Sequence, residues 1–154
     1  MKVLVIGSGA IGGLAGSHMS RAGHDVTLVD RWAEHVAALN EHGLVIDGVR
    51  GDFTIPVKAI TPDQLGRHVA EEGPLEAILI ATKSQHTGQA VREVIPHMSA
   101  ESYIVSFQNG FNEPLISSLL QEAGLGGDER VVGSIPNYGG ALVDPGHLEF
   151  VHEG

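Results

Sequence analysis

KVLVIGSGAIG, from Lys2 to Gly12, carries the strongest structural signal in the chain. Lys2–Ile6 is a short apolar run typical of a buried strand, and Gly7 follows it directly. The glycines at positions 7, 9 and 12 have the spacing G-x-G-x-x-G, and Ala10–Ala22 has the pattern of a helix. A strand, a glycine-rich turn and a helix in this order predict the first unit of a dinucleotide-binding fold.

Each glycine of this turn is required for a different steric reason. Gly7 permits a tight turn, Gly9 lets the backbone approach a diphosphate, and Gly12 lets the helix pack closely on the strand. The free N–H groups and the partial positive charge of the helix N-terminus would bind the anion. The candidate cofactor-binding residues of this turn are Gly7, Ser8, Gly9, Ala10, Ile11 and Gly12. The alternative is a glycine-rich turn that binds no ligand.

Asp30 ends the second predicted strand and Arg31 follows it at once, and the two residues favour different cofactors. Asp30 lies 21 residues after Gly9, where a carboxylate can accept hydrogen bonds from the ribose hydroxyls of NAD and would repel the 2′-phosphate of NADP. Arg31 could instead pair with that phosphate. For Asp30 the alternative is a purely structural role as a helix N-cap.

Strands alternate with helices along the whole chain. Further strands are predicted at Val26–Val29, Glu76–Ala81, Ser102–Phe107 and Val131–Ser134, and helices at Arg31–Glu41, Thr87–Met98 and Phe111–Glu122. Leu44–Ile46 pairs with Phe53–Val57, and Ala141–Val143 pairs with Leu148–Val151 around Asp144-Pro145-Gly146. The pattern predicts an α/β, Rossmann-type, doubly wound and mainly parallel sheet in three layers, with a terminal β-hairpin.

The composition excludes several classes of function. The 154 residues contain 9 Lys and Arg against 19 Asp and Glu, a formal charge of −10, which disfavours binding to nucleic acid or to anionic membranes. There is no cysteine, so disulfides and thiolate metal sites are excluded. The nine histidines show no metal-ligand spacing, and we expect no metal site. No apolar run is long enough for a signal peptide or a membrane span, so we expect a cytoplasmic protein.

Three motifs in order resemble the ketopantoate reductase (2-dehydropantoate 2-reductase) family. They are Gly7–Gly12, Thr82-Lys83-Ser84-Gln85 after the fourth Rossmann strand, and Gln108-Asn109-Gly110 after the fifth. Gly23-His24-Asp25-Val26 and Pro145-Gly146-His147 are similar to family features as well. The resemblance covers essentially the whole chain, but it corresponds only to the N-terminal, cofactor-binding half of the family.

The resemblance implies roles for individual residues. Arg31 matches the arginine that binds the 2′-phosphate of NADP, which favours NADP(H), while Asp30 departs from the apolar residue often found there and keeps NAD(H) open. Lys83 matches a lysine at the rim of the cofactor and substrate site, and Asn109 an asparagine that contacts the nicotinamide ribose and the substrate. A solvated loop lysine and a plain turn are the structural alternatives for these two residues.

The family's catalytic acid, a lysine, and a substrate-binding carboxylate belong to a helical second domain. We therefore expect residues 1–154 to form a NAD(P)-binding Rossmann domain without that helical domain, with no catalytic residue of its own. On this expectation the chain by itself binds a dinucleotide but is inactive. A strand edge left bare by the missing half would favour a homodimer.

These observations lead to one main functional prediction and two alternatives. The main prediction is the NAD(P)H-dependent reduction of a small 2-keto acid, 2-dehydropantoate to pantoate in pantothenate biosynthesis, with this chain as the cofactor-binding half. The first alternative is a dinucleotide-sensing Rossmann module without catalysis. The second is an NAD-linked 2-hydroxy acid dehydrogenase of the same family.

Overall fold

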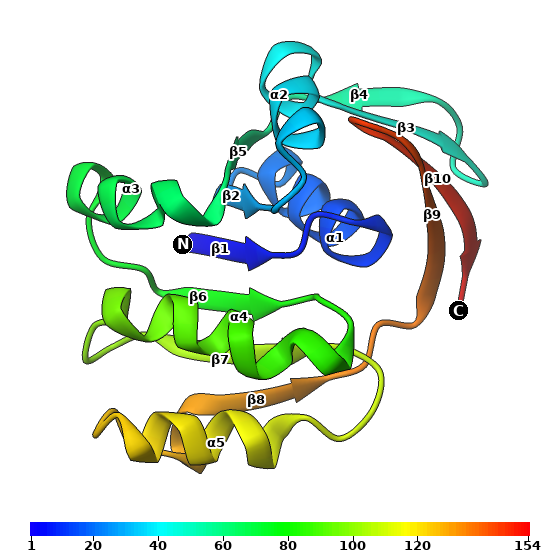
Figure 1. The fold of residues 1–154 in the computed structure, drawn as a ribbon. Coiled ribbons are helices and arrows are strands. Elements are labelled where there is room, and N and C mark those ends of the chain that lie inside the picture. The colour runs from blue at the N-terminus through cyan, green and yellow to red at the C-terminus, as the bar shows by residue number, and fades with distance from the viewer.

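A computed structural model describes all residues from Met1 to Gly154 and contains two sheets. The larger sheet has six parallel strands in the order β5-β2-β1-β6-β7-β8 (Figure 1). These strands are β1 (Lys2–Ile6), β2 (Asp25–Val29), β5 (Lys58–Ile60), β6 (Ala77–Ile80), β7 (Tyr103–Phe107) and β8 (Val131–Ser134). The chain starts in the middle, runs outward to β5 and then crosses to β6, so the strand order reverses between β1 and β6. This topology confirms the doubly wound, Rossmann-type prediction.

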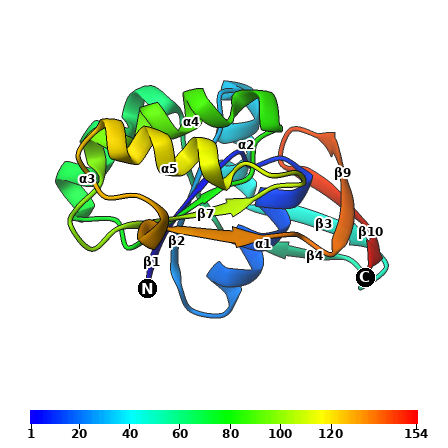
Figure 2. The same ribbon diagram turned by 90° about the horizontal axis from the view of Figure 1, so that it is seen from below.

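Helices cover both faces of the larger sheet. They are α1 (Ala10–Arg21), α2 (Ala33–His42), α3 (Leu65–Glu72), α4 (Thr87–Val94) and α5 (Glu113–Glu122). Figure 2 shows α4 and α5 on one face of the sheet and α1 on the other. Short 3₁₀ turns complete the connections at Pro62–Gln64, Ser84–His86, Ile95–His97 and Asp128–Arg130. None of the helices combines the length and the apolar character that a crossing of a bilayer requires.

The buried strand β1 divides the core into two halves. Val3 and Val5 belong to a cluster with side chains of α1, α2 and the smaller sheet, whereas Leu4 and Ile6 belong to a cluster with side chains of α3, α4 and α5. Because successive side chains of a strand point to opposite faces, a continuous apolar run such as this one needs cover on both sides. The predicted three layers follow from this requirement.

A second sheet of four strands packs beside α1. Its order is β4-β3-β10-β9, with β3 at Leu44–Gly48, β4 at Phe53–Ile55, β9 at Tyr138–Asp144 and β10 at His147–Glu153. The two predicted hairpins are both present, and β3 and β10 pair in parallel to join them into one sheet. The terminal hairpin is therefore part of the core, since Leu148 and Phe150 of β10 are buried with α1 and α2.

The prediction of one strand over Phe53–Val57 is wrong. The structure ends β4 at Ile55 and begins a separate strand, β5, at Lys58, in the other sheet. Pro56 lies between them, and proline interrupts a strand because it has no N–H group to donate. β5 is held in place by Asn40, whose side-chain amide bonds the N–H and the C=O of Ala59 at 2.9 and 2.8 Å. The third Rossmann strand, β5, was thus not predicted from the sequence.

Candidate functional site

The candidate site lies at the carboxyl-terminal edge of the large sheet, where the strand order reverses. Gly7 follows β1, Asp30 follows β2, Thr82 and Lys83 follow β6, and Asn109 follows β7. The strands end at the same level, because Ile6 is paired with both Val29 and Ile80. In open α/β sheets this is the position at which ligands bind.

The glycine turn has the geometry expected of a diphosphate cradle. Gly7 has φ +95°, a conformation that other residues rarely adopt. A Cβ at Gly12 would lie 2.0 Å from the carbonyl oxygen of Gly7, so only glycine allows α1 to pack here. A Cβ at Gly9 would meet no atom within 4 Å, and the space beside this backbone is open. The first amides of α1 have no acceptor within the helix, so the turn is free to bind an anion.

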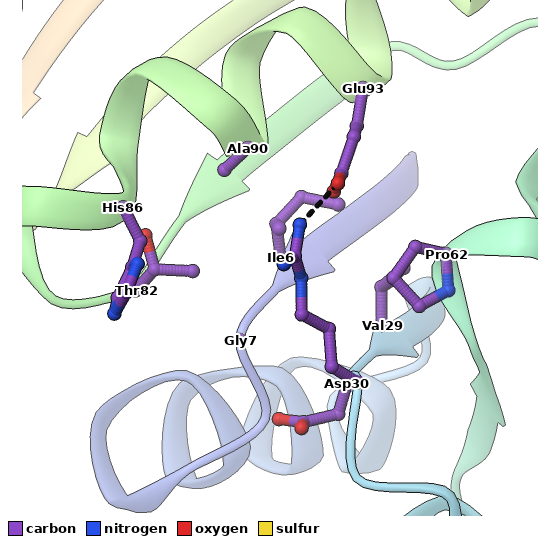
Figure 3. Close-up of a pocket in the computed structure, with 10 residues that line it drawn as sticks. Ile6, Gly7, Val29, Asp30, Pro62, Thr82, His86, Ala90 and Glu93 are labelled. Atoms are coloured by element: carbon purple, nitrogen blue, oxygen red, sulfur yellow. Dashed lines mark hydrogen bonds and ion pairs between the residues drawn. The ribbon is translucent and has the colours of Figure 1, made fainter.

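Two cavities meet over this turn. The smaller, of about 160 Å³, lies between the ends of β1 and β2 and the helix α4 (Figure 3). The larger, of about 450 Å³, extends from Gly9 to Lys83 and Asn109. Gly7, Asp30 and Thr82 line both cavities. The Oγ1 of Thr82 is buried without a hydrogen-bond partner, which leaves it free for a ligand. Together the cavities offer an elongated site that suits a dinucleotide.

Asp30 is held by the glycine turn. Its Oδ2 accepts hydrogen bonds from the N–H and the Oγ of Ser8 at 2.9 and 3.0 Å, and its Oδ1 accepts one from the N–H of Trp32 at 3.0 Å. The N-cap residue of α2 is Trp32, not Asp30. Asp30 therefore fixes the turn and the start of α2 together, and still lines both cavities.

Ser8 occupies a different position from its neighbours in the turn. It is fully buried, and it lines neither cavity because its N–H and Oγ are both directed to Asp30. The structure places Ser8 behind the turn, where it orients the carboxylate of Asp30, and its role as a cofactor-binding residue stays a prediction.

Arg31 forms an ion pair with Glu93 of α4. The two residues come from different βαβ units, 62 positions apart, and both line the smaller cavity. The Arg31 side chain is 57% exposed and that of Glu93 is 30% exposed. Sequence reasoning identified Arg31 but missed Glu93, because no local pattern connects these two residues.

Lys83 and Asn109 lie in the same cavity. Both are exposed, and the Ser84 hydroxyl donates a hydrogen bond of 3.0 Å to the backbone carbonyl of Asn109, so the two loops touch. Behind them the buried amide of Gln108 donates to the carbonyl of Thr82 at 2.7 Å and to the hydroxyl of Thr87 at 2.9 Å. These hydrogen bonds of Gln108 were not predicted from the sequence, although Gln108 directly precedes the Asn109-Gly110 pair.

The second sheet supports the glycine turn from behind. The fully buried His35 accepts the N–H of Gly146 at its Nδ1 (2.9 Å), so its Nε2 carries the proton and donates to the carbonyl of Ser8 (3.1 Å). Tyr138 donates its hydroxyl to the carbonyl of Ile11 at 2.7 Å. Burial raises the pKa of the Tyr138 phenol far above its ordinary value, which keeps the donor protonated. The terminal hairpin thus positions the turn.

Among the polar side chains, no group of three or more histidines and carboxylates gathers in a way that could hold a metal ion. His86 lines the smaller cavity as an exposed residue at the start of α4. His147 lies elsewhere, 2.8 Å from Asp47 in the second sheet. The glycine turn, Lys83 and Asn109 carry groups that can bind an anion and form hydrogen bonds.

Comparison with known proteins places this geometry in a family. The family model for ketopantoate reductase PanE/ApbA matches residues 3–154. A 2-dehydropantoate 2-reductase of Pyrococcus abyssi is 36% identical over the whole of this chain and 46% of its own length. The structure of 2-dehydropantoate 2-reductase from Geobacter metallireducens superimposes with a TM-score of 0.83 at 26% identity, over all of this chain and 47% of its own.

The same fold occurs in a dehydrogenase. The ternary structure of D-mandelate dehydrogenase with NADH and anilino(oxo)acetate has a TM-score of 0.81 at 21% identity, over 97% of this chain and 45% of its own. The chain spans about half the length of the curated relatives that it matches. The comparisons therefore concern the part of these proteins that corresponds to residues 1–154.

Proposed function

Because the chain belongs to the ketopantoate reductase family, we propose that residues 1–154 form the nicotinamide-dinucleotide-binding domain of an oxidoreductase acting on a small 2-keto acid. The expected substrate is 2-dehydropantoate, the compound in the names of several relatives. The observation that carries the proposal is the open space over Gly9, in the cavity that also contains Lys83 and Asn109 and that adjoins the smaller cavity at Gly7, Asp30 and Thr82.

The residues of the turn would hold the diphosphate of the cofactor. Gly7, Gly9, Ala10 and Ile11 line the larger cavity, and the free amides of α1 favour negative charge there. Asp30 and Arg31 would contact the ribose next to the adenine. When bound, the nicotinamide ring supplies the hydride for the reduction.

Lys83 and Asn109 would orient the substrate. The ammonium group of Lys83 has no protein carboxylate within ion-pairing distance, so it is available for the carboxylate of a 2-keto acid. The amide of Asn109 can donate to the keto or carboxylate oxygens and accept from a ribose hydroxyl. Holding both partners at one end of the sheet aligns the two reacting centres. We place the proton donor in a further helical domain, so that the 154-residue chain binds without turnover.

Titration with NADH and NADPH tests the proposal directly. Trp32, the only tryptophan, directly follows Arg31, which lines the smaller cavity, and its fluorescence should be quenched when the dinucleotide binds. Gly9→Asp should abolish binding, because aspartate is a favoured N-cap whose carboxylate folds over the free amides and occupies the cradle. Since a Cβ at Gly9 meets no atom, the variant should melt at the temperature of the parent protein.

A folded parent protein that binds neither dinucleotide would contradict the proposal. Lys83→Ala tests the substrate role. The affinity of this variant for the dinucleotide should stay within about twofold of that of the parent protein. Its binary complex with the dinucleotide should bind the keto acid about tenfold more weakly, the effect of losing one charge-assisted contact. Arg92→Ala is the matched control, because Arg92 is an exposed cation of the adjoining helix α4 that lines neither cavity.

A second candidate is the oxidation of a 2-hydroxy acid with NAD. The carboxylate of Asp30, which lines both cavities, favours it because a cofactor with free ribose hydroxyls is the usual partner of such a residue. Binding of 2-hydroxy acids in the presence of NAD, compared with keto acids in the presence of the reduced cofactor, would separate the two directions.

A further inference from the structure

The smaller cavity contains an ion pair that joins two separate parts of the chain. Arg31 lies in the loop between β2 and α2. Glu93, labelled in Figure 3, lies in the last turn of α4. Both residues line the cavity, together with Asp30 and Pro62. Glu93 also accepts a long hydrogen bond of 3.4 Å from Gln89, one turn earlier on the same helix. The carboxylate is thus oriented from its own helix toward Arg31.

Acidic groups outnumber basic ones around this cavity. Asp30 and Glu93 contribute two carboxylates, and Arg31 is the one lysine or arginine that lines it. His86, the remaining titratable side chain, is exposed at the opposite end. With Arg31 already paired, no free cation faces the position at which the ribose next to the adenine would lie.

This arrangement affects two forms of the cofactor differently. A phosphate monoester carries a charge of about −1.5 to −2 at neutral pH. To bind near Arg31 it would have to displace Glu93 and then remain close to two carboxylates. A ribose with free hydroxyls needs no cation and can donate to Asp30, whose oxygens retain acceptor capacity beyond the bonds from Ser8 and Trp32.

We propose that Glu93 is a specificity-determining residue, which selects the unphosphorylated dinucleotide by occupying Arg31 and adding a second carboxylate to the pocket. The inference deepens the proposed function and rests on it. In this arrangement the ion pair with Glu93 prevents Arg31 from binding a phosphate. The choice between NAD(H) and NADP(H) is therefore made by Glu93, a residue of a different structural unit.

The test compares NADH and NADPH dissociation constants, measured by calorimetry, for the parent chain and four variants. The parent should prefer NADH. Glu93→Gln, which keeps the shape, and Glu93→Ala, which removes the acceptor, should each tighten NADPH binding by about tenfold, the effect of one charge-assisted phosphate contact. NADH affinity should change by less than about twofold. Glu122→Gln, the same change at an exposed position outside the pocket, should alter neither constant.

A double variant separates specificity from structure. Adding Arg31→Ala to Glu93→Gln should remove the gain in NADPH affinity, because the freed guanidinium produces it. If the ratio of the two constants is unchanged in both Glu93 variants while NADH binds, the role of Glu93 is wrong and the proposed function stands. If neither dinucleotide binds to any variant or to the parent, the proposed function fails and this inference fails with it.

Discussion

Gly9 and Gly12 are separated by one turn of helix and are needed for opposite reasons. At Gly12 there is no room, because a Cβ would overlap the carbonyl oxygen of Gly7 and approach the Cβ of Ala81 to 2.8 Å. At Gly9 there is ample room, and glycine is needed only if a ligand uses that space. The first glycine of this pair is thus a candidate for function, and the second a requirement of packing.

Gly12→Ala should therefore destabilise the protein by about 1–3 kcal/mol, the usual effect of overpacking a core. The matched control is Gly9→Ser, which should remain within about 0.5 kcal/mol of the parent, because serine is a favoured N-cap and its Cβ contacts nothing. Urea unfolding followed by circular dichroism measures both values. A loss for Gly12→Ala as small as that expected for Gly9→Ser would show that the close contact at Gly12 relaxes without penalty.

Buried polar side chains fix the individual elements to one another. Gln108 connects the segment after β7 to the segment after β6, and His35 connects α2 to the glycine turn and to the terminal hairpin. A second group of histidines lies on helix faces: His18 on α1 and His68 on α3, where burial lowers the pKa of each imidazole. These groups make the packing of α1 and α3 sensitive to acid.

The free energy of unfolding should decrease as the pH falls below 6.5, the ordinary pKa of histidine. The sign follows because the unfolded chain binds protons at pH values at which His18 and His68 of the native state remain neutral. His68→Leu should reduce the loss of stability between about pH 7.5 and pH 5.5. His42→Gln, at an exposed position at the end of α2, is the control. A slope unaltered by His68→Leu would place the acid sensitivity elsewhere.

The whole molecule depends on the junction of its two sheets. β10 follows the rest of the chain, yet it pairs with β3 in parallel, and its residue Leu148 is fully buried in the cluster that contains Leu14 and Leu39. The same hairpin supplies Tyr138 to the turn of α1. Packing between the sheets therefore affects the geometry of the candidate site.

Leu148→Ala should lower the free energy of unfolding by about 2–5 kcal/mol, the range for truncation of a buried leucine. Leu142→Ala in β9 removes the same atoms from a residue that is 37% exposed, so its effect should be much smaller. Differential scanning calorimetry of the two variants measures the difference. Similar melting temperatures would indicate that the second sheet contributes little to the common core.

The strand, turn and helix at Lys2–Arg21 could be predicted because glycine spacing and apolar periodicity act over a few residues. The rule that parallel strands end at one edge extended the prediction to Lys83 and Asn109, which line one cavity as expected. Their roles toward a ligand, like those of Asp30 and Arg31, stay predictions. The family could also be identified from three short motifs, because each motif lies at the end of a single strand.

Contacts between distant segments could not be predicted in this way. The pairing of β3 with β10, the bond from His35 to Gly146 and the ion pair of Arg31 with Glu93 join residues 62 to 111 positions apart. Short-range patterns hold no information about which of many exposed carboxylates will meet a given guanidinium. Packing of the helices against the sheet determines it, because only the folded backbone brings α4 over the end of β2. The candidate binding residues could thus be identified from local chemistry, whereas the charge around them was set by the tertiary structure.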